Sequence, residues 1–138
     1  MKKTTLTVLF CGFMALIITG CGTSKGNISE YVTKDVESHI YTKKEINNAI
    51  KVTTEYFKEN FDGCTLNEIY YSGDEYSQGY QDWANRNNAD EVIVLLSTFK
   101  TGKKGGDGSL NPNDTYSNWN WILVRTDKGK WVHVDHGY

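Results

Sequence analysis

Nine residues, Glu91 to Phe99, constrain the possible folds of this chain more than any other segment. They read EVIVLLSTF, and an extended chain of this sequence presents apolar side chains on both of its alternating faces. A strand with one face in water alternates apolar and polar residues, so this segment is expected to be covered on both sides. We therefore predict a sheet in which residues 91–99 form a central strand.

The clearest helical pattern runs from Tyr41 to Gly63. Thr42 and Glu45 have the spacing of a capping box, in which each side chain bonds a free backbone N–H at the start of a helix. At about 100° per residue, one side gathers the side chains suited to a core and the other gathers charged and amide groups. The core-facing set is Ile46, Ala49, Ile50, Thr53, Tyr56, Phe57 and Phe61. Because Gly63 is well placed to end it, the pattern predicts an amphipathic helix of about five turns.

Two shorter patterns flank the polar residues 72–75. The segment before them, Cys64 to Tyr71, is rich in strand formers and predicts another strand. After them we expect a short helix from about Glu75 to Arg86, weakened by Gly79, because aromatic residues recur at helical spacing. These aromatic residues are Tyr76, Tyr80 and Trp83. Residues 100–118 are rich in glycine and contain the only proline, so they should form a loop.

The segment from Trp119 to Tyr138 predicts a β-hairpin, and its register decides which side chains share a face. A type I turn with Gly129 in the left-handed conformation would close a loop from Asp127 to Gly129. This register gathers the aliphatic side chains on one face. A two-residue turn would split them, because a slip by one residue turns every side chain over. The predicted pairs are Arg125 with Trp131, Leu123 with His133 and Trp121 with Asp135.

Strict alternation then assigns the hairpin side chains to two faces. One face is aliphatic and consists of Ile122, Val124, Val132 and Val134. The other holds Trp121, Leu123, Arg125, Trp131, His133 and Asp135. His136 is expected to point away from His133, so the two imidazoles should not meet at one ion, and neither a metal nor another cofactor is predicted. Because His133 and Asp135 share a face, an acid/base pair stays open as an alternative.

Several aromatic side chains fall on or near the same face as His133. Arg125 is expected opposite Trp131 at the range of a cation–π contact. One interpretation is that the rings form a second layer of core beneath the short helix. The other is a concave pocket or a partner surface. The candidate patch for a ligand or partner is Tyr116, Trp119, Trp121, Arg125, Trp131, His133 and Asp135.

The N-terminal residues indicate export and anchoring. A positive start (MKK) precedes an apolar stretch at residues 6–18, which is too short to cross a bilayer but suits a signal peptide. The tetrapeptide ITGC, which ends at Cys21, resembles a bacterial lipobox. This resemblance implies cleavage before Cys21 and a diacylglyceryl anchor on its sulfur. We therefore expect a signal peptide (1–20), a tether (21–38) and a single α+β domain (39–138) at the extracytoplasmic face of the cell membrane.

Charge and cysteine content restrict the partners and the kinds of site that we expect. From Cys21 onward the chain carries thirteen Lys and Arg residues, the fifteen of the whole chain less Lys2 and Lys3, against seventeen Asp and Glu residues. The net charge of that part is therefore −4, and no basic patch interleaved with aromatic residues is present. Nucleic acid is not an expected partner. With Cys21 lipidated, Cys64 is the remaining thiol, and we expect a buried apolar side chain rather than a nucleophile.

A series of short motifs between Tyr41 and Tyr138 resembles a known group of proteins. The motifs YTKKEI, GCTL, ADEVIVLLSTF, NWNWILVR and HVDHGY are similar to those of small lipoproteins of Gram-positive anaerobes that carry a domain of unknown function. That group is placed among the cystatin-like, SnoaL-like α+β folds. The resemblance implies a long N-terminal helix packed across a curved, mainly antiparallel four-stranded sheet, with a short second helix. It assigns no catalytic residue, because this superfold hosts enzymes and binding modules alike.

Three functions are consistent with these observations. The first, which we favour, is a membrane-tethered module that binds an unknown small molecule or protein without catalysing a reaction. The second is a small enzyme in the concavity of the sheet, with His133 and Asp135 as its acid/base pair. The third is an envelope-stress or self-protection lipoprotein that acts through a partner protein.

Overall fold

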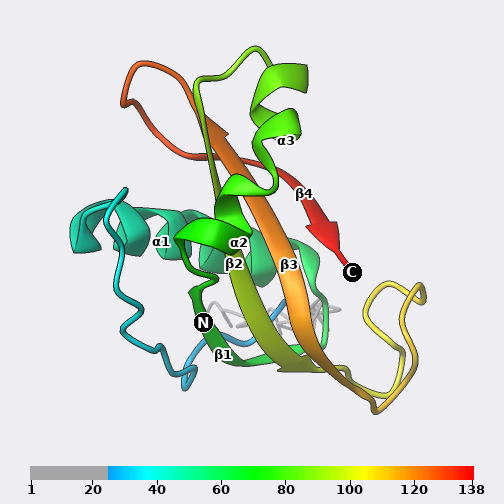
Figure 1. Cartoon of the computed structure of the whole chain (residues 1–138). Coiled ribbons are helices and arrows are strands. Elements are labelled where there is room, and N and C mark those ends of the chain that lie inside the picture. Colours follow the sequence, from blue (N-terminus) through cyan, green and yellow to red (C-terminus); the bar gives the residue numbers. More distant parts are fainter. Residues whose placement is uncertain (1–24) are drawn as a thin grey trace, which may run out of the picture.

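The computed structural model describes residues 25–138, and the predicted signal peptide and Cys21 lie outside them. The elements are α1 (Lys43–Asn60), β1 (Thr65–Tyr71), α2 (Asp74–Gln78), α3 (Gln81–Arg86), β2 (Glu91–Lys100), β3 (Thr115–Arg125) and β4 (Val132–Gly137). The four strands pair in sequence order, each antiparallel to its neighbour, and the sheet is open (Figure 1). The predicted α+β class with a long helix on a four-stranded antiparallel sheet is therefore confirmed.

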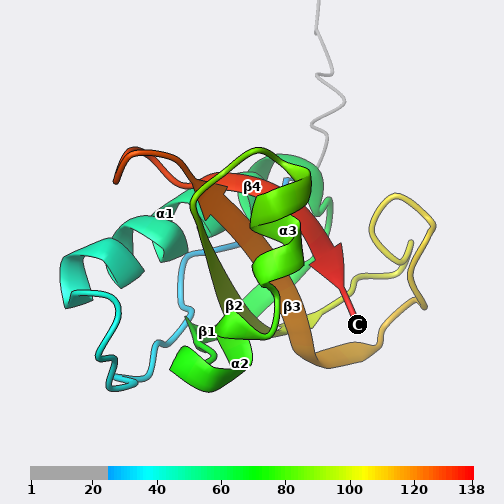
Figure 2. The ribbon, with the colours of Figure 1, turned by 45° about the horizontal axis from the view of Figure 1, so that its top comes forward.

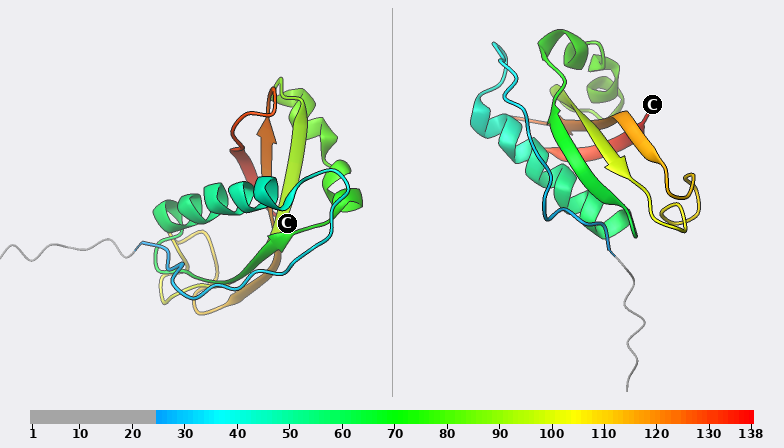
Figure 3. Two further views of the ribbon diagram at one scale, coloured as in Figure 1. Left: turned by 90° about the vertical axis from the view of Figure 1, so that its left-hand side faces the viewer. Right: turned by 90° about the horizontal axis from the view of Figure 1, so that it is seen from below.

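The sheet is covered on both faces, as the sequence of β2 predicts. α1 lies across one face, and the bent pair of α2 and α3 lies on the other (Figure 2 and Figure 3). Within β2, Ile93 and Leu95 belong to the core beneath α1, whereas Val92 and Val94 pack with Ala84 of α3. Each of the three strand pairs contains one register shift, and such bulges bend strands, which accounts for the curvature of the sheet.

The long helix α1 begins as predicted. The Glu45 N–H donates to Thr42 Oγ1 over 3.2 Å, and the Thr42 N–H donates to Glu45 Oε2 over 2.8 Å, which completes the capping box. The helix ends at Asn60 with Phe61 as its C-cap, so Gly63 comes two residues after the cap. Its φ of +68° makes it the left-handed residue that turns the chain into β1.

The predicted short helix is divided into two pieces. α2 ends at Gln78 and α3 begins at Gln81, with Gly79 and Tyr80 at the bend. Glycine favours the helix less than other residues do, and this one lies where the helical hydrogen bonds are interrupted. Ser77 of α2 contacts the sheet, where its hydroxyl accepts the Val94 N–H over 2.9 Å.

The described part of the expected tether, residues 25–38, packs against the domain. Val32 pairs with β1 in parallel, since its N–H donates to Asn67 O and its carbonyl accepts the Ile69 N–H, both over 3.0 Å. At the start of this segment the Gly26 N–H donates to Lys58 O over 2.9 Å. The segment therefore covers the outer edge of β1, which differs from the free linker expected from its composition. Within residues 25–138, no helix is both long enough and apolar enough to cross a bilayer.

The turn between β3 and β4 differs from the predicted one. Asp127 and Lys128 have positive φ values of 52° and 56°, and the Gly129 N–H donates to Thr126 O over 2.9 Å. Two left-handed central residues are typical of a type I′ turn, so the prediction of Gly129 as the left-handed residue is wrong. One extra residue before Val132 nevertheless restores the predicted register close to the turn, but the predicted pair of Trp121 with Asp135 is wrong, because Trp121 pairs with His136. Leu123 pairs with His133, as expected.

Candidate functional site

A β-bulge in β4 overturns the predicted orientation of His136. Leu123 pairs with His133, but the next residue, Ile122, pairs with Asp135, so Val134 is an extra residue in the ladder. From Asp135 onward, the side chains of β4 therefore lie on the opposite faces from those that regular alternation predicts. His136 therefore lies opposite Trp121 and on the same face as His133, and the expectation that the two imidazoles diverge is wrong.

The two imidazoles are in contact through one nitrogen of each ring. His136 Nδ1 lies 3.3 Å from His133 Nε2, and the ring planes are inclined by only 18°. One of these nitrogens carries the proton and the other accepts it, with the assignment set by the tautomers. The bulge thus converts two strand residues that would face opposite sides into one hydrogen-bonded pair, which we call the histidine pair.

Aromatic rings enclose the histidine pair. The ring of Tyr56 on α1 lies 4.1 Å from that of His133, measured between centroids, and the ring of Trp121 lies 5.1 Å from that of His136. Burial lowers the pKa of His133 to about 4, and the neighbouring His136 adds to this effect. Burial also lowers the pKa of His136. Both imidazoles are therefore neutral at pH 7, and each has one N–H donor and one nitrogen lone pair, one of which accepts the hydrogen bond within the pair.

Asp135 does not join the histidine pair. It is the ladder partner of Ile122, a residue of the core on the α3 side of the sheet. Among the described residues, no hydrogen bond links the Asp135 carboxylate with either imidazole, and the partner of His133 is His136. The geometry therefore gives no support to His133 and Asp135 as an acid/base pair.

Most of the predicted aromatic patch lies inside the protein. Trp121 is fully buried in the core beneath α1, and its indole N–H donates to Ser97 Oγ over 2.8 Å. Trp131 is also buried, and its indole N–H donates to Glu45 O over 3.0 Å. Trp119 is 9% exposed and Tyr116 is half-buried. The rings thus form the core layer under α1, and only the end of β3 that carries Tyr116 and Trp119 approaches the surface.

Arg125 lies in a buried ion-pair cluster that joins α1, β2 and β3. It is 4% exposed, and its guanidinium donates to Glu45 over 2.6 Å and to Glu91 over 2.7 Å. Its carbon Cζ also lies 4.2 Å from the centroid of Trp131, which confirms the predicted cation–π contact. Because its buried guanidinium bonds to two carboxylates of this chain, Arg125 holds the fold together rather than presenting a charge to a partner.

A cleft of about 440 Å³ lies beside the histidine pair. It opens between the last turn of α1, the glycine-rich loop before β3 and the end of the sheet. Its lining residues are Tyr56, Asn60, Phe61, Gly106, Asp107, Ser109, Leu110, Trp119 and His136. The indole nitrogen of Trp119 is buried and has no hydrogen-bond acceptor among residues 25–138. A buried donor without an acceptor is costly, and of the three described residues with such an unpaired atom, Thr53, Ser72 and Trp119, only Trp119 lines this cleft.

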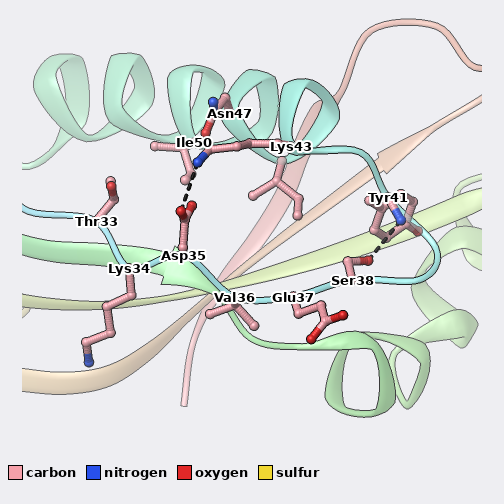
Figure 4. A pocket seen from close by; sticks show the side chains of 11 residues that line it. Thr33, Lys34, Asp35, Val36, Glu37, Ser38, Tyr41, Lys43, Asn47 and Ile50 are labelled. Atoms are coloured by element: carbon pink, nitrogen blue, oxygen red, sulfur yellow. Dashed lines mark hydrogen bonds and ion pairs between the residues drawn. The ribbon is translucent and has the colours of Figure 1, made fainter.

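A larger groove, of about 740 Å³, lies between residues 33–38 and the first half of α1 (Figure 4). Asp35 and Lys43 form an ion pair across it, with 2.8 Å between Oδ2 and Nζ. Ser38 Oγ accepts the Tyr41 N–H over 2.9 Å at its other end. Exposed charges that pair with one another are usually solvated surface. We therefore place the candidate site in the cleft beside the histidine pair.

The sequence pointed to only two of the residues in this cleft. Trp119 belonged to the candidate patch, and His136 was noted but assigned to the opposite face. Asn60, Asp107 and Ser109 were missed, because they come from the end of a helix and from a loop that only the fold brings together. The tight loop itself is marked by Gly105, whose φ is +64° and whose position leaves no room for a side chain against the Leu110 carbonyl.

A cysteine nucleophile and a closed metal site receive no support here. Cys64 is 1% exposed, and burial raises the pKa of its thiol, so the prediction of a buried apolar cysteine is confirmed. Within residues 25–138, no group of three or more His, Cys, Asp or Glu side chains converges as a closed metal site would require.

Comparison of the chain with protein-family models, with curated proteins and with solved structures found no match.

Proposed function

We propose that this protein is a membrane-tethered, extracytoplasmic binding module whose cleft takes a small, neutral, polyhydroxylated ligand such as a sugar. In this proposal Cys21 carries the diacylglyceryl anchor, and the domain belongs with the cystatin-like, SnoaL-like folds. The observation that carries the binding function is the buried indole N–H of Trp119, a lining residue of the cleft, which has no acceptor among residues 25–138.

The lining of the cleft supports a neutral ligand with many hydroxyl groups. Asn60 and Ser109 can each donate and accept a hydrogen bond, and the neutral His136 can do either. Asp107 is the one full charge among the lining residues, and a carboxylate disfavours an anionic ligand. Tyr56 and Phe61 add apolar ring surface. A sugar presents donors, acceptors and an apolar ring edge together, which fits a cleft of this size and composition.

The short connection to the anchor supports a ligand close to the bilayer. Four residue steps separate Cys21 from Lys25, a reach of at most ~14 Å. Gly26 bonds to Lys58 near the C-terminal end of α1, and the cleft is lined by Asn60 and Phe61 at that same end. With Cys21 in the membrane, the cleft would lie at the membrane-proximal end of the domain.

The binding proposal is tested by NMR on the full chain in detergent micelles, with N-acetylglucosamine and glucose as probes. We expect one of these sugars to shift the indole N–H signal of Trp119 saturably. The indole signal of Trp83, which packs on the α3 side of the sheet, should stay in place. Asn60→Ala should weaken binding about three- to tenfold, because one hydrogen bond is lost.

The control variant is Asn85→Ala on the exposed surface of α3, which should bind the sugar as the wild type does. A Trp119 signal that does not move at about 50 mM of either sugar would contradict the proposal, because even weak millimolar binding would be visible there. Equal losses in the two asparagine variants would also contradict it.

A further inference from the structure

The histidine pair has the spacing of two ligands on one metal ion. A zinc–imidazole bond is ~2.0–2.1 Å long, so two nitrogens at tetrahedral angles on one ion lie about 3.3–3.4 Å apart. His136 Nδ1 and His133 Nε2 are 3.3 Å apart. Two half-buried side chains therefore already hold the separation that a bound ion would impose on them.

We propose that His133 Nε2 and His136 Nδ1 form a binding site for a divalent transition metal ion of the Zn²⁺, Ni²⁺ or Cu²⁺ class. The ion takes the place of the proton between the two nitrogens. The ring that carries this proton releases it and takes one up on its other nitrogen, so both imidazoles stay neutral and no net proton is released. The two M–N bonds replace the single N–H···N hydrogen bond.

The ligand atoms select the class of ion. Imidazole nitrogen suits Zn²⁺, Ni²⁺ and Cu²⁺, whereas Mg²⁺ and Ca²⁺ require oxygen ligands. No third His, Cys, Asp or Glu completes the set within residues 25–138, so the remaining coordination positions belong to water or to a bound molecule. Such an ion would be exchangeable rather than structural. His136 also lines the cleft, which Asn60, Asp107 and Ser109 line as well.

Neighbouring aromatic rings pack against both imidazoles and fix their positions. The ring of Tyr56 lies 4.1 Å from that of His133 and 5.7 Å from that of His136. The ring of Trp121 lies 5.7 Å and 5.1 Å from the same two imidazoles. Rings fixed by their neighbours lose little freedom when they bind an ion. The inference is independent of the sugar proposal, because it rests on the histidine pair and not on the Trp119 donor.

The site is tested with the full chain in detergent micelles, without a polyhistidine tag and at neutral pH. Calorimetry with ZnCl₂ should show one saturable ion per chain, reversed by EDTA. His133→Gln and His136→Gln should each weaken this binding about tenfold or more, because even the loss of a group that only supports a ligand costs about that much. The matched control is His39→Gln, which removes the third and exposed histidine and should bind zinc as the wild type does.

Paramagnetic Ni²⁺ locates the ion without any substitution. We expect NiCl₂ to broaden the indole signals of Trp121 and Trp119, whose rings lie 5.1 and 6.0 Å from His136, before that of Trp83. The proposal is overturned if no saturable binding of either ion occurs below about 1 mM. It is also overturned if His39→Gln alone abolishes binding, or if Ni²⁺ broadens Trp83 first.

Discussion

Replacing Arg125 with methionine is expected to lower the free energy of unfolding by about 3–5 kcal/mol. Methionine fills much of the same space but leaves the carboxylates of Glu45 and Glu91 without the guanidinium that bonds to both. Glu91 keeps only Lys128, 2.7 Å away, and the Lys128 side chain is largely exposed. Removing one partner of a buried ion pair costs more than the pair itself contributes, because a buried charge is left uncompensated. Urea denaturation at pH 7 measures this loss.

Arg86→Met is the matched control for this substitution. The guanidinium of Arg86 lies 4.4 Å from the ring of Trp83 on the exposed side of α3, without a carboxylate partner among the described residues. Its loss should cost less than about 1 kcal/mol. A loss below 1 kcal/mol in Arg125→Met, no larger than in the control, would contradict the role of the cluster.

The pH dependence provides a second measure of the cluster. The Thr42 backbone N–H and the Arg125 guanidinium lower the pKa of Glu45 to about 2, from 4.5. A carboxylate with a lowered pKa contributes stability that is complete above about pH 4.5 and lost as the pH falls through about 2. The difference in stability between wild type and Arg125→Met should therefore shrink as the pH falls from about 5 to 2. A difference that stays constant over this range would contradict the assignment.

Replacing Cys21 with alanine is expected to release the protein completely from the membrane fraction. Two acyl chains hold a lipoprotein firmly, because each buried CH₂ contributes about 0.8 kcal/mol, and this substitution removes the attachment atom for both. Fractionation of cells and mass spectrometry of the N-terminal peptide measure the effect. Cys64→Ala is the matched control, since the Cys64 thiol is buried and the variant should stay on the membrane. Retention of Cys21→Ala after a salt wash would contradict the anchor.

Local sequence patterns were sufficient to predict the features that depend on the residues of one helix, strand or hairpin. The capping residues and the 3.6-residue period of α1 are visible in one stretch of sequence, and the apolar run of β2 requires cover on both faces wherever it lies. The contact of Arg125 with Trp131 was predictable for the same reason, because a hairpin brings near neighbours together. The glutamate partners of Arg125 were not predicted, because they come from distant elements.

The turn and the N-terminal segment depend on contacts that no local pattern shows. The Asp127 N–H donates to Asp90 Oδ2 over 2.8 Å, and Lys128 pairs with Glu91, so the loop before β2 holds two left-handed residues in place. Residues 25–38 pair with β1 through backbone groups such as those of Val32. Backbone pairing at a sheet edge needs few apolar side chains, which is why composition alone indicated a free linker.

The histidine pair could not be predicted from the sequence, because it depends on one unpaired residue, Val134, in the ladder between β3 and β4. Val134 is an ordinary strand residue, and both the regular and the bulged register place aliphatic side chains of the hairpin on the α3 side. The choice between them depends on His136, which packs against Phe61 of α1 and Trp121 of β3 in the bulged register. Those contacts exist only once α1 lies across the sheet, so periodicity within β4 does not reveal them.

The histidine pair and the orientation of His136 both depend on the bulge at Val134, which nuclear Overhauser effects between side chains can detect. In the full chain in detergent micelles, we expect cross-peaks between the ring protons of His133 and His136, and from both imidazoles to the ring of Tyr56. A regular β4 would turn His136 to the other face of the sheet. Cross-peaks from His136 to the methyl groups of Ile122 and Val124, with none to His133, would contradict the bulge and remove the histidine pair.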